Sequence, residues 1–195
     1  MMKRLLVGFL SIFILSACSQ EENDGILLTQ KVEIPNTIFT SEKQNSVIDE
    51  EEIKLSIQTY LDSSEELLNA SEPYQEMIYE EEELSVEELE KLDKINKLTK
   101  ENDENFANYI LNNTLPEGYQ EESERISRYI TAVNEVLYEI DEMVDNVTTD
   151  ANKGVIPKVN ITSIIGKFDV VNGKEQKKIE EFLDKKIINT KAFGR

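Results

Sequence analysis

The sequence contains no histidine and no tryptophan, and its single cysteine is Cys18. Without histidine, the chain lacks the commonest general base, every Ser-His-Asp arrangement and any histidine-ligated zinc or iron site. One cysteine cannot form an intrachain disulfide. No Gly-rich phosphate loop, CxxC, HExxH or EF-hand pattern is present. These absences predict no catalytic residue, no metal site and no cofactor, so we expect a protein that is not an enzyme.

Positive charge is also scarce, since 21 Lys and Arg residues face 40 Asp and Glu residues and the net charge is -19. Nucleic-acid binding needs a basic surface that neutralises phosphates, so this balance excludes it and argues against broad adhesion to anionic wall polymers. The many acids leave one enzymatic alternative, in which two carboxylates act as acid and base on wall sugars. We do not favour it, because forty acids always provide some suitably spaced pair.

The first seventeen residues have the pattern of a bacterial secretory signal. Two basic residues at the start precede an apolar run over residues 5–15, which is too short for a stable membrane span. Leu15-Ser16-Ala17-Cys18 then matches a lipobox, at which a bacterial cell attaches diacylglycerol and cleaves before the cysteine. The alternative is an ordinary cysteine after a simple cleaved signal. We predict a lipoprotein signal peptide over residues 1–17 and lipidation at Cys18.

Lipidation at Cys18 places the protein at the extracellular face of the cell membrane, because two acyl chains give lasting attachment where one gives only marginal binding. Residues 18–45 follow as a lipid-anchored tether, with a polar start and a proline, Pro35, that interrupts any helix. Part of the tether is too apolar for a free coil and could pack against the rest of the protein. These apolar residues are Ile26, Leu27, Leu28, Val32, Ile34, Ile38 and Phe39.

Residues 46–195 are predicted to form an all-α domain, a helical bundle of about four main helices with an irregular segment before the last one. The longest helix is expected from Ser85 to Asn113, because this stretch has no proline or glycine and Ser85 with Glu88 makes a capping box. Residues at alternating steps of three and four form one stripe along it. The stripe consists of Leu89, Leu92, Ile95, Thr99, Asn102, Phe106, Tyr109, Ile110 and Asn113.

Three further helices are expected around this one. Ser46, with Asp49 behind it, is a cap candidate for a helix that runs to about Ala70, after which Ser71-Glu72-Pro73 predicts a break. A heptad stripe predicts a helix from about Gln120 to Asn146, with Ile126, Val133, Ile140 and Val147 on its buried face.

The segment from Thr148 to Gly173 is irregular, because glycines and a proline punctuate it. Asn172 then caps the last helix. The residues expected to face inward from that helix are Ile179, Phe182, Leu183 and Ile187.

The long helix also contains the motif Asn102-Asp103-x-x-Phe106. In a short acidic chain with a lipobox, this motif resembles the NDxxF-motif lipoproteins of Gram-positive bacteria, a family with no established biochemical function. The length and the helical, Glu/Lys-rich character are also similar to those of the YkyA-type lipoproteins, which are described as cell-wall-binding proteins. Neither resemblance implies a catalytic residue.

The motif has two interpretations. In the structural one, Asn102 bonds across the bundle, Phe106 lies in the core, and Asp103 sits at the margin and caps a neighbouring backbone. In the functional one, the three residues form a pocket for a partner or ligand on the bundle face. We favour the structural interpretation, because motif residues on an apolar stripe usually belong to the core.

The sequence therefore favours a membrane-anchored lipoprotein that acts as a non-enzymatic protein-binding module at the cell envelope. Its expected partner is another envelope protein, and no small-molecule ligand is expected. The alternative is a lipoprotein that binds wall polymer or divalent cations through acidic helix faces. Residues 49–90 hold sixteen acids against the single base Lys54, although such a run is also typical of a solvated surface.

Overall fold

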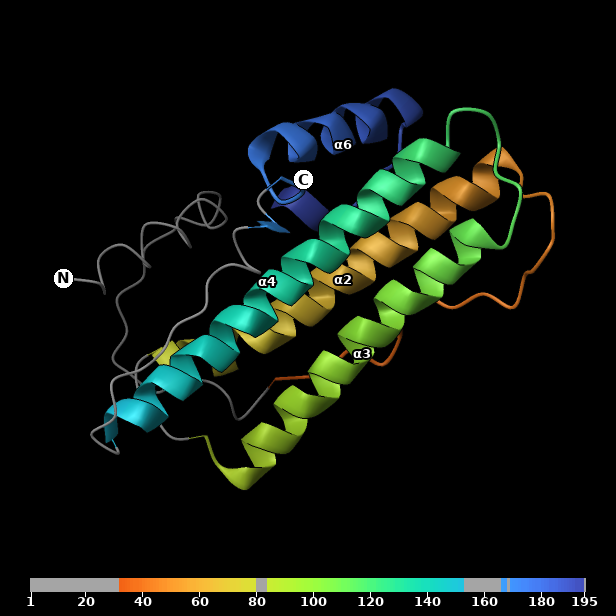
Figure 1. The fold of residues 1–195 in the computed structure, drawn as a ribbon. Coiled ribbons are helices and arrows are strands. Elements are labelled where there is room, and N and C mark those ends of the chain that lie inside the picture. The colour runs from red at the N-terminus through yellow and green to blue at the C-terminus, as the bar shows by residue number, and fades with distance from the viewer. Residues whose placement is uncertain (1–31, 80–83, 153–165, 168, 195) are drawn as a thin grey trace.

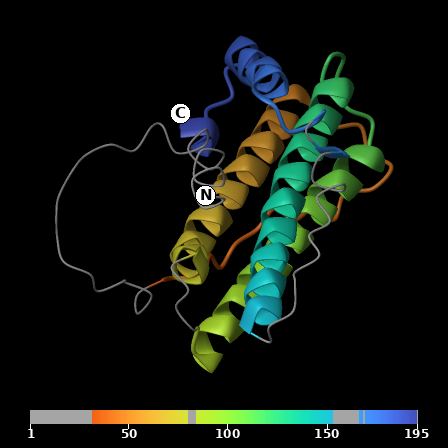
Figure 2. The same ribbon diagram turned by 60° about the vertical axis from the view of Figure 1, so that its left-hand side comes forward.

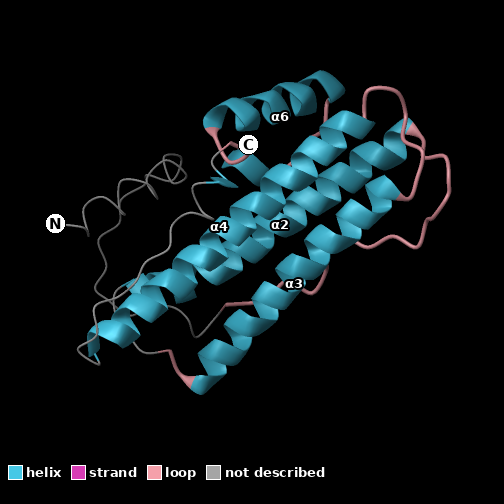
Figure 3. Ribbon diagram, viewed as in Figure 1, coloured by secondary structure: helices cyan, strands magenta, loops and turns pink. Residues whose placement is uncertain are grey.

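A computed structural model describes residues 32–79, 84–152, 166–167 and 169–194 (Figure 1). The described residues form four α-helices and a short 3₁₀ helix and contain no β-strand, so the predicted all-α bundle is confirmed (Figure 3). The predicted signal peptide and the lipidation site Cys18 lie outside the described residues. The elements are α2 (Glu50–Tyr79), α3 (Val86–Leu111), α4 (Gln120–Asn152), α6 (Gly173–Lys186) and η2 (Ala192–Gly194).

Helices α2, α3 and α4 lie side by side, and each contacts the other two (Figures 1 and 2). The chain reverses direction at each connection, so α3 is antiparallel to both neighbours and α2 and α4 run in parallel. Helix α6 packs against the first half of α4, and η2 packs against the middle of α2. The carboxylate of Asp62 on α2 holds the segment before η2, because it accepts hydrogen bonds from Thr190 Oγ1 and Lys191 N, both at 2.7 Å.

Helix α2 differs from its prediction at the start and near the end. It begins at Glu50, where Asp49 Oδ1 accepts a hydrogen bond from Glu52 N at 2.9 Å, so Asp49 and not Ser46 fills the cap position. Pro73 lies inside a continuous helix that runs to Tyr79, and the predicted break there is wrong. Tyr74, on the buried face beside this proline, packs into the interior, and that packing outweighs the single backbone hydrogen bond a proline removes.

Helix α3 begins as predicted. Ser85 Oγ accepts a hydrogen bond from Glu88 N, and Glu88 Oε2 accepts one from Ser85 N, which completes the capping box. The helix ends at Leu111, two residues before the predicted end. Leu89, the first residue of the predicted stripe, is half exposed, because it precedes the part of α3 that is covered by the other helices.

In α4, Ile126 is buried and Val133 is partly buried against the main core, as predicted, while the side chains of Ile140 and Val147 lie outside the described part of the chain. Helix α4 extends six residues beyond the predicted Asn146, to Asn152. In α6, Asn172 caps the first turn and Ile179, Phe182 and Leu183 are buried. Ile187, predicted to face inward, is exposed, because it adopts a left-handed conformation with φ of 56° that ends the helix and turns the chain. Ile188 takes the buried position instead.

The buried side chains form two clusters. The main core lies between the first half of α2, the second half of α3, the start of α4, and α6. Its aromatic members are Phe39, Tyr60, Phe106, Tyr109, Tyr119, Tyr129 and Phe182. The second core lies further along the bundle and consists of Leu67, Ala70, Tyr74 and Ile95.

Residues 32–45, which we call the strap, pack against α2 and α3 (Figure 2). We refer to the surface of α2 and α3 that the strap covers as the groove. Phe39 is part of the main core, and Val32, Ile34 and Ile38 pack against the second core. The apolar residues of the predicted tether therefore do pack against the bundle wherever they are described, and Ile26 to Leu28 lie outside the described residues. None of the described helices has the length and hydrophobicity needed to cross a lipid bilayer.

Candidate functional site

The structure places all three motif residues on one buried face of α3. Phe106, Asn102 and Asp103 are 0%, 1% and 7% exposed. The spacing correctly predicts that Asn102 and Phe106 face the interior. Asp103 was expected at the margin of the bundle and is instead buried, because α4 covers the side of α3 on which it lies.

Asn102 connects three segments of the chain. Its Oδ1 accepts a hydrogen bond from the backbone N–H of Phe39 in the strap at 2.8 Å. Its Nδ2 donates to Ser64 Oγ at 2.9 Å and to the carbonyl oxygen of Tyr60 at 3.4 Å, both on α2. Every polar atom of this buried amide therefore has a partner, as burial of an amide requires.

Asp103 connects α3 with both neighbouring helices. One carboxylate oxygen accepts a hydrogen bond from the hydroxyl of Tyr60 at 2.7 Å, and the other accepts one from Asn134 Nδ2 at 3.0 Å. Asp103 therefore accepts hydrogen bonds from two side chains, and the prediction that it caps a neighbouring backbone is wrong. Burial raises the pKa of Asp103, and the hydrogen bonds from Asn134 and Tyr60 oppose that rise. Burial, with the nearby Asp103 carboxylate, also holds the pKa of Tyr60 well above its usual range, so the hydroxyl stays a donor.

Phe106 packs beneath this polar cluster. Its ring stacks on the ring of Tyr60, with the centroids 4.1 Å apart and the planes at 5°. The ring of Phe39 meets it edge to face, with the centroids 5.3 Å apart and the planes at 85°. The motif thus joins α2, α3, α4 and the strap at one place in the main core.

Two asparagines other than the three fixed motif residues take part in the same arrangement, and the sequence reasoning missed the role of both. Asn105 Nδ2 donates to the carbonyl oxygen of Phe39 at 3.0 Å. The side chain of Asn113, placed on the stripe but given no partner, accepts from Ser46 N and donates to the carbonyl oxygen of Lys43, both at 3.0 Å. The signal in the sequence is the three-residue spacing of Asn102 and Asn105, which puts both amides on neighbouring positions of one helix surface.

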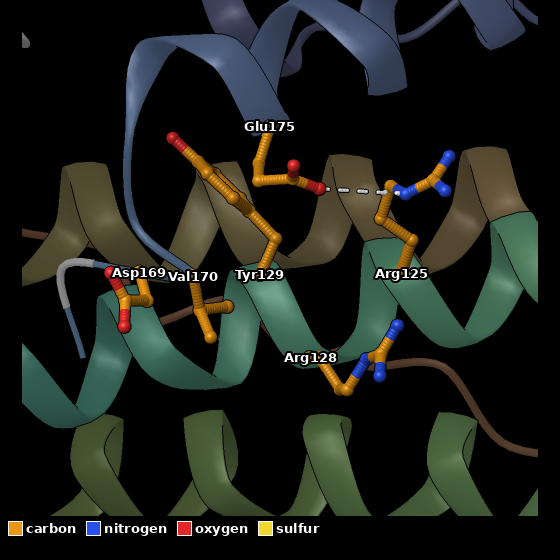
Figure 4. A pocket seen from close by; sticks show the side chains of 6 residues that line it. All are labelled: Arg125, Arg128, Tyr129, Asp169, Val170 and Glu175. Atoms are coloured by element: carbon orange, nitrogen blue, oxygen red, sulfur yellow. Dashed lines mark ion pairs between the residues drawn. The ribbon is translucent and has the colours of Figure 1, made fainter. Parts of the chain in front are cut away.

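A surface hollow of about 210 Å³ lies between α4 and the turn that leads into α6 (Figure 4). Arg125, Arg128 and Tyr129 come from α4, Glu175 from α6, and Asp169 from the turn. The ion pair between Arg125 and Glu175, at 3.5 Å, crosses from α4 to α6, and Arg125 also pairs with Glu121 and Glu122. These carboxylates neutralise the charge of Arg125.

The tyrosine in this hollow is not suited to acid–base chemistry near neutral pH. Burial raises the pKa of Tyr129 to about 12, and its hydroxyl donates to Gln176 Oε1 at 3.3 Å. Within the described ranges, no group of three or more acidic or cysteine side chains is placed to hold a metal ion. The hollow lies where the Arg125–Glu175 ion pair joins α4 to α6.

Large apolar side chains are exposed at one end of the molecule. Asn45 N donates to Asn112 O at 2.7 Å, which brings the end of the strap to the end of α3. Lys186 Nζ lies 3.6 Å from Glu50 Oε1, which brings the end of α6 to the start of α2. Four side chains around these junctions are 63–83% exposed, and we call them the apolar end: Val47, Leu55, Leu111 and Ile187.

A scan against protein-family models, a search of curated proteins and a search of solved structures each found no match for this chain. Function is therefore inferred from the residues and geometry of the chain itself.

Proposed function

We propose that this protein is a lipid-anchored, non-enzymatic lipoprotein that binds another protein at the outer face of the cell membrane. The observation that supports it best is the apolar end, where Val47, Leu55, Leu111 and Ile187 are each more than 60% exposed. Single exposed apolar residues are common, but several near the same end of a strongly acidic molecule are typical of a contact surface.

The side chains of this end also indicate what kind of partner surface would be complementary to it. Burial of apolar surface contributes roughly 25 cal/mol per Å², so four such side chains can supply the centre of an interface. The acids in the first turn of α2 beside Leu55 are paired with lysines, since Lys54 contacts Glu50 and Glu51 and Lys43 contacts Glu52. A partner surface with an apolar centre would be complementary to this end.

The motif supports the same proposal in a different way. The polar atoms of Asn102 and Asp103 are used in hydrogen bonds within the chain, and Phe106 is fully buried. A recognition surface on this protein must then lie elsewhere, and the apolar end is available. The chain resembles the NDxxF-motif lipoproteins, and in this chain the motif has a structural role.

The membrane anchor belongs to the proposal and depends on the lipobox at Cys18, outside the described residues. The described chain starts at Val32 beside the second core, in the half of the bundle away from the apolar end. An anchor on the N-terminal side of Val32 would leave the apolar end free to meet a partner. Cys18→Ala should leave an uncleaved precursor or release protein into the medium. A mature variant that stays with the membrane through a high-salt wash would contradict the anchor.

The proposed contact surface can be tested by site-specific photocrosslinking in intact cells, with mass spectrometry of the products. A photoreactive residue at position 111 should give one dominant protein adduct. Val86, which is equally exposed but lies at the start of α3 on the opposite end, is the matched control and should not give that adduct. Equal adducts at both positions, or none at position 111, would contradict the proposal.

A further inference from the structure

The strap is held by a pair of side chains that bind both backbone groups of one residue. Asn102 Oδ1 accepts the N–H of Phe39 at 2.8 Å, and Asn105 Nδ2 donates to the carbonyl oxygen of Phe39 at 3.0 Å. The ring of Phe39 meets the rings of Phe106 and Tyr109 edge to face, each at 5.3 Å between centroids. Two amides at the backbone and an aromatic pocket for the side chain are the contacts by which proteins bind an extended peptide.

The rest of the strap is bound in the same manner. Val32, Ile34 and Ile38 lie against the second core, and further along the chain Asn113 Nδ2 donates to the carbonyl oxygen of Lys43. Residues 32–45 contain neither helix nor strand. The strap therefore resembles a ligand lying in a groove more than an element of the bundle.

We propose that the groove between α2 and α3 is a docking site for an extended peptide that carries an aromatic residue, and that its occupant is the chain's own strap. The strap leaves and re-enters the groove while the three-helix bundle stays folded. The bundle does not need the strap for its connectivity, since α2, α3 and α4 each contact the other two directly. Segments with few backbone hydrogen bonds open locally at a lower free energy than the whole protein unfolds.

The docking site of Phe39 is distinct from the proposed partner surface, which the strap meets at its last residue, where Asn45 N donates to Asn112 O. Release of the strap would change how far residue 32 can lie from the bundle. With the strap docked, Val32 lies against the second core. With the strap released, the bundle gains up to about 45 Å of extra reach from the fourteen residues, at roughly 3.3 Å per extended residue.

The first test is hydrogen exchange on the full chain. Asn105→Ala removes one of the two side chains that bind the backbone of Phe39, at a half-buried position. Asn108→Ala changes an exposed asparagine one turn further along α3. In Asn105→Ala, the amides of residues 32–45 should exchange about five- to tenfold faster while those of α2, α3 and α4 keep their wild-type rates. Asn108→Ala should match the wild type. Faster exchange of strap and helices together would overturn the proposal, and so would identical behaviour of the two variants.

The second test asks whether the groove binds the strap in trans. A fluorescent peptide with the sequence of residues 32–45 is titrated into full-length Phe39→Ala, whose own strap is weakened, and into the wild type, whose strap competes at high effective concentration. The peptide should bind the variant about tenfold or more tightly than the wild type, and adding Asn105→Ala should reduce that binding.

Phe39→Leu, which keeps an apolar side chain, replaces Phe39→Ala if circular dichroism shows that the alanine variant is unfolded. No binding to a folded variant would overturn the proposal. A wild-type dimer whose straps exchange between copies would overturn the assignment of the occupant, because the groove would then hold the strap of a second copy.

Discussion

The two cores of this bundle both include residues of α2 and α3 but are specified differently. Tyr60 and Tyr74 both come from α2, and both are fully buried. In the main core, the hydroxyl of Tyr60 donates to Asp103, which also accepts from Asn134 on α4. In the second core, the hydroxyl of Tyr74 has no hydrogen-bond partner among the described residues. One region thus combines apolar packing with a connected polar network, and the other shows packing alone.

The difference indicates which region determines the arrangement of the helices. Apolar side chains pack acceptably in several helix registers. A buried carboxylate between two donors accepts both hydrogen bonds in only one register. We infer that the Tyr60–Asp103–Asn134 network fixes how α2, α3 and α4 sit relative to one another. The predictions below separate this contribution from that of packing, beginning with the largest expected effect.

Phe106→Ala should lower the free energy of unfolding by about 3–5 kcal/mol, since it leaves a cavity under the ring of Tyr60 and removes the contact with Phe39. For a chain of this size, each kcal/mol lowers the melting midpoint by about 2–4 °C. Thermal melts followed by circular dichroism measure the loss. Leu89→Ala, at a half-exposed position of the same helix, is the control and should cost about 0.5 kcal/mol or less. Equal melting of both variants would show that the main core does not depend on this ring.

The sequence predicts the local features of the fold well, because they depend on neighbours in the chain. The capping box of Ser85 and Glu88 and the cap at Asn172 need contacts over only three residues. Pro73 and Ile187 were predicted wrongly for the opposite reason. Packing of the whole helix overrides the local preference of the proline, and a backbone turn at Ile187 moves the inward position to Ile188.

The candidate site could be predicted only in part. Helical spacing is enough to place Asn102 and Phe106 inside, since it depends on one helix. The partners of Asp103 depend on how three helices meet, because Tyr60 and Asn134 lie 43 and 31 residues away from it along the chain. No local pattern contains that information. The strap contact of Asn102 with Phe39, 63 residues away, was unpredictable for the same reason.

Tyr60→Phe should destabilise the protein by about 1.5–3 kcal/mol, the usual contribution of a hydrogen bond to a charged group. The substitution keeps the ring and its stacking on Phe106, so it removes only the donor to Asp103. Urea denaturation at neutral pH measures the change. A loss of under about 0.5 kcal/mol would mean that the polar network does not stabilise the main core.

Tyr74→Phe is the matched substitution in the second core, and we expect it to have the opposite sign. It removes a buried hydroxyl that has no partner among the described residues, so the folded state should gain up to about 1 kcal/mol. The same urea denaturation measures it. A loss comparable to that of Tyr60→Phe would contradict the difference between the two cores.

Asp103→Asn tests the network through its dependence on pH. Because burial raises the pKa of Asp103 above its ordinary 3.8, the folded state binds this proton more tightly than the unfolded chain does. Protonation therefore stabilises the fold at low pH, and that stabilisation is lost as the pH rises through the folded pKa.

Asparagine at position 103 keeps the size of the protonated side chain and does not titrate. The wild type should therefore lose stability relative to Asp103→Asn as the pH rises from below 3.8 to neutral. Urea midpoints of both proteins across this range give the difference, in which the titration of the other acids cancels. Glu104→Gln removes one exposed charge from the same helix and serves as the control. If the difference instead moves in favour of the wild type with rising pH, the donors Tyr60 and Asn134 outweigh burial, and the network favours a charged Asp103.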